Sequence, residues 1–191
     1  MRSFFVTARP VTTFKPTESV GPLKYLEDLM AAKNLETQDI DADELKAAVE
    51  GGDGIWAIRG GGNQRGWNGI RYRAGMSAKN VGSTQLSMNV ATIPPGAVAK
   101  AHVHVGFDVM LYILQGRVRH EYGDHLKQVI DNEAGDFIYI EPGVPHEVFN
   151  LSDEEEVVAV VARSDASEWE NIVPYDRESG LVVEIVDGKD A

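Results

Sequence analysis

Two histidines, His102 and His104, stand one residue apart in the stretch AKAHVHVGFDVMLYILQG. In a β-strand alternate side chains point to the same face, so this spacing would place two imidazoles side by side. Two such imidazoles can hold one metal ion, and Asp108, four residues further on, could supply a carboxylate ligand. A strand that merely contains histidine has the same spacing, so the pair alone does not decide between the two interpretations.

A third histidine, His146, follows a turn rich in proline and glycine in the stretch EPGVPHEVFN. It could complete the site if the fold brings it beside His102 and His104. The chain has no cysteine, which excludes disulfides and thiolate catalysis and leaves any metal to histidine and carboxylate ligands. Three histidines and a carboxylate would accept Fe, Mn, Ni, Co, Cu or Zn, and these ligand types select none of them.

The region that contains these residues, about 71–163, has the pattern of an all-β domain. Short runs rich in β-branched and aromatic residues are separated by Pro, Gly, Asp and Asn, which predicts a sandwich or a barrel. The runs are QLSMNVATI, VMLYIL, RVRHEY, DFIYI, HEVFN and VVAVVA. One further strand is predicted from Leu181 to Val186.

The segment before the predicted strands has a different pattern. Residues 1–20 suit an extended arm, and helical spacing of apolar residues begins after Pro22. A second short helix is predicted from the pair Asp41 and Glu44, with Gly51 and Gly52 at its end. The glycine-rich residues 58–69 lack a phosphate-loop ending and a dinucleotide fingerprint, so they are predicted to be a loop.

The two histidine segments resemble the paired motifs of the cupin superfamily. The first reads G-AVAKA-H-V-H-VGF-D with a later glycine at position 116, and the second reads G-DFIYI-E-P-G-VP-H-EVF-N. Other stretches resemble a group of bacterial single-domain type-2 cupins. The resemblance implies a single double-stranded β-helix (jelly-roll) barrel over residues 71–165. An arm with two short helices would occupy residues 1–70, and a C-terminal strand and tail would occupy residues 166–191.

The resemblance also implies a metal site and a homodimer. It gives His102, His104 and His146 as metal ligands and Asp108 as the fourth. Asp108 departs from the pattern, because the motif has glutamate there and because counting seven residues back from Gly116 leads to Val109. Another departure is Glu141, which stands where the second motif usually has proline.

Three further side chains are candidates for catalytic roles. In RVRHEY, alternation puts His120 on the same face as Val118, so His120 would orient a ligand or transfer a proton if that face lines the barrel. A packed core histidine is the alternative. Tyr112 and Tyr139 are also pocket candidates, and Tyr112 points inward only if Asp108 sets the phase of its strand.

Composition narrows the possible partners and the compartment. The 18 basic and 30 acidic residues give a net charge of -12, which argues against nucleic acid and anionic membranes as partners. The apolar runs are too short for a membrane helix, and the N-terminal stretch is unlike a signal peptide. We therefore expect a cytoplasmic protein whose partner is a small molecule.

Two functions fit this site. The first is a metal-dependent enzyme on a small organic substrate, in which dioxygenase-type oxidoreductase chemistry is favoured over isomerase, lyase or decarboxylase chemistry, because Fe(II) with open positions binds both O₂ and substrate. The second is a non-catalytic cupin that binds a small molecule or a sugar. Fold resemblance cannot separate them, because one scaffold hosts many reactions.

Overall fold

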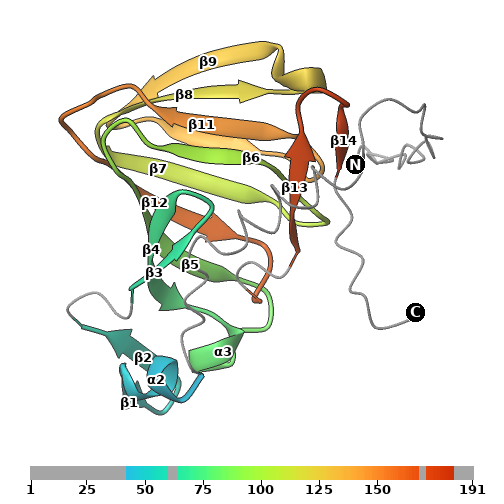
Figure 1. Cartoon of the computed structure of the whole chain (residues 1–191). Coiled ribbons are helices and arrows are strands. Elements are labelled where there is room, and N and C mark those ends of the chain that lie inside the picture. The colour runs from blue at the N-terminus through green and yellow to red at the C-terminus, as the bar shows by residue number, and fades with distance from the viewer. Residues whose placement is uncertain (1–41, 60–63, 168–170, 183–191) are drawn as a thin grey trace, which may run out of the picture.

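Two six-stranded antiparallel sheets face each other in the computed structural model, which describes residues 42–59, 64–167 and 171–182 (Figure 1). The first sheet has the strand order β10-β7-β12-β5-β4-β3, and the second has the order β14-β13-β6-β11-β8-β9. A separate hairpin pairs β1 with β2. The strands are β1 (Val49–Gly52), β2 (Ile55–Ile58), β3 (Gln64–Trp67), β4 (Ile70–Met76), β5 (Ser87–Ile93), β6 (Val98–His104), β7 (Val109–Gln115), β8 (Arg117–Tyr122), β9 (Gln128–Glu133), β10 (Phe137–Ile140), β11 (His146–Asn150), β12 (Val157–Arg163), β13 (Ile172–Asp176) and β14 (Leu181–Val182).

The helices of the described residues are short. They are α2 (Ala42–Ala47), α3 (Ala78–Val81) and the 3-10 turn η1 (Asp124–Leu126). Ser77 caps α3, where its side chain accepts a hydrogen bond from the backbone N–H of Lys79. Within the described residues, no helix is long and apolar enough to cross a membrane.

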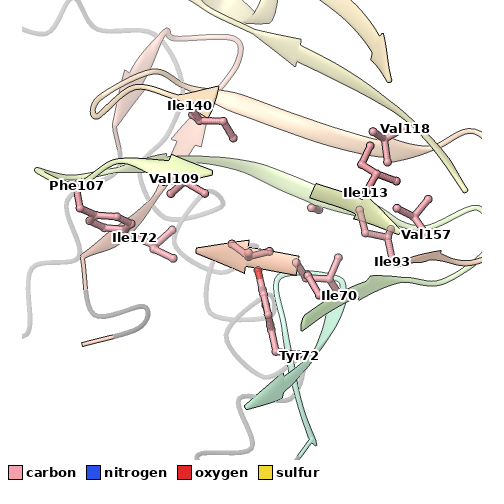
Figure 2. Packing of buried hydrophobic residues seen from close by; sticks show 13 residues of the cluster. Ile70, Tyr72, Ile93, Phe107, Val109, Ile113, Val118, Ile140, Val157 and Ile172 are labelled. Carbon is pink, nitrogen blue, oxygen red and sulfur yellow. The ribbon is translucent and has the colours of Figure 1, made fainter. Parts of the chain in front are cut away.

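Alternation along the strands builds the interior between the two sheets. In β12 every second residue from Val157 is buried, and β5 has the same inward period from Ser87. Figure 2 shows the resulting cluster of 13 buried residues, in which Ile113 of β7 lies with Val157 and Ile93, and Val109, further along the same strand, lies near Phe107. The predicted all-β barrel is therefore confirmed.

β7 ends at a tight turn at Gly116, and its burial pattern shows which of its side chains point inward. Gly116 has a φ of +84° between β7 and β8, and a Cβ there would lie 2.8 Å from the carbonyl oxygen of Glu156. The strand that ends at this turn buries Val109 and Ile113. Asp108 and Tyr112 consequently belong to the outward phase of the strand.

Two predictions for the region before the barrel need correction. The second helix is present as α2, but it ends at Ala47, and the two glycines expected to close it lie in β1. Residues 64–67 of the predicted loop form β3, which pairs with β4 through a two-residue turn. That turn, Asn68-Gly69, has φ of 54° and 84°, the left-handed values that a tight hairpin requires.

The remaining predictions differ in outcome. All six apolar runs of the barrel form strands, and those of β8 and β11 begin and end at the expected residues. The strands β9 and β13 were not predicted, since β9 is largely exposed and β13 contains Pro174. The arm and the helix expected after Pro22 lie outside the described residues, and β14 is described only for Leu181–Val182.

Candidate metal centre

Three histidines meet on the inner face of the second sheet. His102 and His104 come from β6, and His146 begins β11, where it lies directly opposite His102 in the register of the two strands. Their possible ligand atoms all lie within 4.8 Å of one another. The ring centroids are 4.3 Å apart for His102 and His146, and all three side chains are buried.

Backbone carbonyl groups orient two of these imidazoles. Nδ1 of His102 lies 2.7 Å from the carbonyl oxygen of Lys100, and Nδ1 of His146 lies 3.0 Å from that of Val144. A carbonyl oxygen only accepts, so Nδ1 carries the proton and donates in both residues. This leaves the Nε2 lone pair of each ring available to a metal, an arrangement typical of metal-ligating histidines.

Burial keeps the cluster uncharged. Loss of hydration lowers the pKa of His146 to about 4, and it moves the pKa of His102 well below the usual range. The pKa of His104 is lowered in the same direction, first by burial and then by the neighbouring His102 and His146. All three rings are therefore neutral at neutral pH, which is the form that binds metal.

The donor set fits a divalent transition metal. Two nitrogen donors at about 2.1 Å from one ion in a tetrahedral or octahedral site lie roughly 3.0–3.4 Å apart, so the most separated ring atoms of this group need to approach by roughly 1.5 Å. Within the described residues, Nδ1 of His104 is a buried polar atom without a hydrogen-bond partner. Neutral imidazoles suit Zn, Cu, Fe and Ni, and the geometry selects none of them.

Asp108 lies outside this group of histidines. One of its carboxylate oxygens accepts a hydrogen bond of 2.7 Å from the hydroxyl of Tyr139, and the other accepts one of 3.3 Å from Ser164. Its backbone N–H donates to the hydroxyl of Ser164. The carboxylate expected as the fourth ligand is thus bound at the outer surface of the first sheet, and the inward position beside it belongs to Val109.

A cavity of about 70 Å³ opens beside the three histidines inside the barrel. Its wall is mostly apolar, and its polar lining includes His120 of β8 and Arg163 of β12. The residues described as lining it include no Asp or Glu. Arg163 also contributes to the lowered pKa of His102 and His104, because its positive charge disfavours protonation of the rings.

The catalytic candidates fall into two groups. His120 is buried and lines the cavity, and burial lowers its pKa to about 4. Tyr112 and Tyr139 do not line it: they lie on the outer face, where the ring of Tyr112 packs at 4.5 Å against Phe137. Tyr112 belongs to the outward phase of β7, and Tyr139 of β10 pairs with the exposed Met110 of that same phase.

Sequence reasoning missed three polar residues around the site. Asn68, in the turn after β3, donates to the carbonyl oxygen of Lys100 that also accepts from His102. Asn89 of β5 accepts a 2.5 Å hydrogen bond from Arg163. Arg163 was detectable, since it continues the inward alternation of Val157 in β12, whereas Asn68 gave no signal beyond the Asn-Gly turn.

A profile of the family described as "Cupin domain" matches residues 89–162, the region that contains all three histidines. The chain contains a cupin domain. The resemblance of its two histidine segments to the cupin motifs is thereby confirmed. A search of curated proteins finds no match to this chain.

Several solved structures are similar to part of this chain. The Schizosaccharomyces pombe Cnp3 cupin domain has 12% identity and a TM-score of 0.48, covering 59% of this chain and 78% of its own. A Lactobacillus farciminis oxalate decarboxylase in a formate complex has 16% identity and a TM-score of 0.51, covering 58% of this chain and 33% of its own. A recombinant oxalate oxidase in complex with glycolate has 22% identity and a TM-score of 0.47, covering 56% and 55%. At 16% identity the likeness to the oxalate decarboxylase concerns the fold alone, and this chain spans only part of the two enzymes.

Proposed function

We propose that this cupin is a metal-dependent enzyme that acts on a small organic substrate, with dioxygenase-type chemistry favoured and isomerase, lyase or decarboxylase chemistry as close alternatives. The observation that carries the proposal is the convergence of three buried, neutral histidines on an internal cavity. Three protein ligands leave coordination positions open for other molecules.

The residues of the barrel have separable roles in this proposal. His102, His104 and His146 hold the metal, and the carbonyl groups of Lys100 and Val144 fix two of the rings. When bound, a divalent transition metal supplies Lewis acidity and, as Fe(II), redox chemistry with O₂. The apolar wall excludes water, and His120 offers a ring nitrogen to a substrate in the same cavity.

The second candidate is a non-catalytic cupin that binds a small molecule or a sugar. It is favoured by the absence of Asp and Glu from the described lining of the cavity. Without a carboxylate, proton transfer beside the metal falls to His120, whose lowered pKa makes it a weak base at neutral pH.

Metal content is the first test. We would purify the protein without a polyhistidine tag, reconstitute it with Fe(II), Mn(II) or Co(II), and measure metal by elemental analysis. The wild type should hold about one equivalent, and the double variant His102→Ala/His146→Ala should hold less than a tenth. His125→Ala is the matched control, because His125 lies in η1 and its Nδ1 bonds the carbonyl oxygen of Arg177. Equal metal in all three proteins contradicts the proposal.

The second test separates an enzyme from a binding protein. Protein loaded with Fe(II) under anaerobic conditions is mixed with oxygenated buffer and a panel of phenols, diketones and small organic acids. Substrate-dependent O₂ uptake, lost in the double variant, supports the oxygenase. Binding by calorimetry without O₂ uptake or any change in the compound supports the binding protein.

We further propose that the protein forms a homodimer through the outer face of the first sheet. This apolar face consists of Met88, Met110, Tyr112, Leu114, Phe137 and Val160. The register places these residues next to one another, because Tyr112 pairs with both Phe137 and Val160. An exposed apolar face of this extent favours association, and a second copy offers the same surface.

The outer face of the second sheet carries charged pairs, and this supports the first sheet as the dimer interface. Arg119 donates two hydrogen bonds to Asp131, and Arg177 bonds the carboxylates of Glu121 and Glu147. Such charged pairs remain hydrated at low cost, so this face gains little from association.

A further inference from the structure

Arg163 is a buried cation in the wall of the cavity. It is the last inward residue of β12 and is 3% exposed. Its Nη1 donates to Asn89, and its guanidinium carbon lies 5.9 Å from the centre of the Tyr72 ring. The guanidinium is thus held in one place between these neighbours.

The register of the first sheet places Arg163 beside the position that the cupin motif reserves for a carboxylate ligand. That position is occupied by Val109, which lies directly opposite Arg163 in the pairing of β7 with β12. Both residues line the cavity together with His102 and His104. The wall of the cavity therefore carries a positive charge from Arg163, and the position of the motif's carboxylate is apolar.

We propose that Arg163 binds the carboxylate of a small anionic substrate whose other end reaches the metal held by the three histidines. The metal end of this inference rests on the function proposed above. A guanidinium has five N–H donors in a planar fork, so it can hold Asn89 and serve a planar two-oxygen acceptor. A buried positive charge also favours an anion over a neutral ligand of the same shape.

The size of the cavity limits the substrate. A volume of about 70 Å³ has room for only a few heavy atoms. The apolar wall, including Val109, Leu111 and Ile138, suits a short hydrocarbon portion. The substrate class is therefore a short-chain carboxylic acid in its ionised form.

Matched probes test the role of the charge. Pyruvate and butane-2,3-dione have similar size and shape, but only pyruvate is an anion. Each is titrated into Co(II)-loaded wild-type protein by calorimetry, with the visible spectrum of Co(II) as a second readout. We expect pyruvate to bind at least about tenfold more tightly than the dione. Equal affinities overturn the inference.

Variants assign the effect to one residue. Arg163→Met should weaken pyruvate binding by about tenfold or more and change the affinity for the dione by less than about twofold. Arg163→Lys keeps the positive charge but lacks the planar fork of donors. Its affinity for pyruvate should therefore lie between that of the wild type and that of Arg163→Met. Arg119→Met, on the outer face of the second sheet, is the control and should bind as the wild type does. If Arg163→Met does not fold, Arg163→Lys and the two probes on the wild type decide the result.

Metal content, measured in the same samples, separates the two proposals. Full metal content with no preference for pyruvate overturns the role of Arg163 and leaves the proposed function standing. Failure to bind metal, with pyruvate binding that still depends on Arg163, overturns the metal-dependent function and supports an anion site. Loss of pyruvate binding together with metal in Arg163→Met contradicts the inference, because Arg163 then acts only by supporting the histidines.

Discussion

Val109 and Arg163 lie directly opposite each other across β7 and β12, and both face the cavity beside the three histidines. The apolar residue occupies the position of the carboxylate ligand in the cupin motif, and its strand partner is a cation. The site therefore lacks the negative charge of a carboxylate ligand and has a positive charge in its wall, unlike a site with three histidines and a carboxylate. This difference makes the site more favourable for an anionic ligand.

Restoring a carboxylate at this position should block anion binding. Val109→Glu adds a negative charge to the wall of the cavity that Arg163 also lines, so pyruvate affinity should fall by about tenfold or more. Val109→Gln adds nearly the same volume without charge and is the control. The measurement is calorimetric titration of pyruvate into Co(II)-loaded protein. Equal losses in the two variants would show that added bulk, and not charge, causes the effect.

Asp108→Asn should leave metal content unchanged, because the carboxylate bonds Tyr139 and Ser164 outside the histidine group. It should also lower the pKa of Tyr139. The hydrogen bond to Asp108 favours the protonated phenol and raises its pKa, and a neutral amide removes most of that effect. Elemental analysis and NMR of ¹³C-labelled tyrosine, assigned with Tyr139→Phe, measure the two results.

A large loss of metal in Asp108→Asn would contradict this arrangement and would show that the carboxylate reaches the ion. The control is Ser164→Ala, which removes the second hydrogen bond to the carboxylate and leaves its charge in place. That variant should retain both the metal and the raised pKa of Tyr139.

The barrel strands were predictable because their apolar residues alternate with a period of two. β8 and β11 match their predicted bounds, and the inward position of His120 follows from the same alternation. Register was not predictable from pattern. His146 lies opposite His102 because two strands more than 40 residues apart in the sequence pair with each other. Only the family motif indicated this pairing.

The errors also have physical causes. The glycines of residues 58–69 concealed a two-residue Asn-Gly turn, which closes the hairpin of β3 and β4. The inward role of Arg163 was missed because the apolar run VVAVVA ends one residue before it, although the alternation continues. The exposed strand β9 lacks a buried face and so has no apolar period to detect.

A charge in the middle of the apolar face should separate the proposed dimer. Val160→Glu places a carboxylate beside Tyr112 and Val90, where association would bury it without a partner. Light scattering coupled to size exclusion should change from the dimer mass to the monomer mass. Val129→Glu, an exposed residue of β9 in the second sheet, is the matched control and should remain dimeric. A wild type that is already monomeric contradicts the proposal.

Metal-free protein should lose stability as pH falls below about 6.5. Burial lowers the pKa of His120 to about 4, whereas an unfolded histidine titrates near 6.5, so between these values the unfolded state binds more protons. The free energy of unfolding therefore decreases through this window, by about 2 kcal/mol from His120 alone between pH 7.5 and pH 5.

Urea unfolding at several pH values measures how steeply the free energy of unfolding depends on pH. His120→Gln removes this contribution, so the stability of this variant should depend less steeply on pH than that of the wild type. Equal slopes in His120→Gln and the wild type would mean that His120 is hydrated in the folded protein.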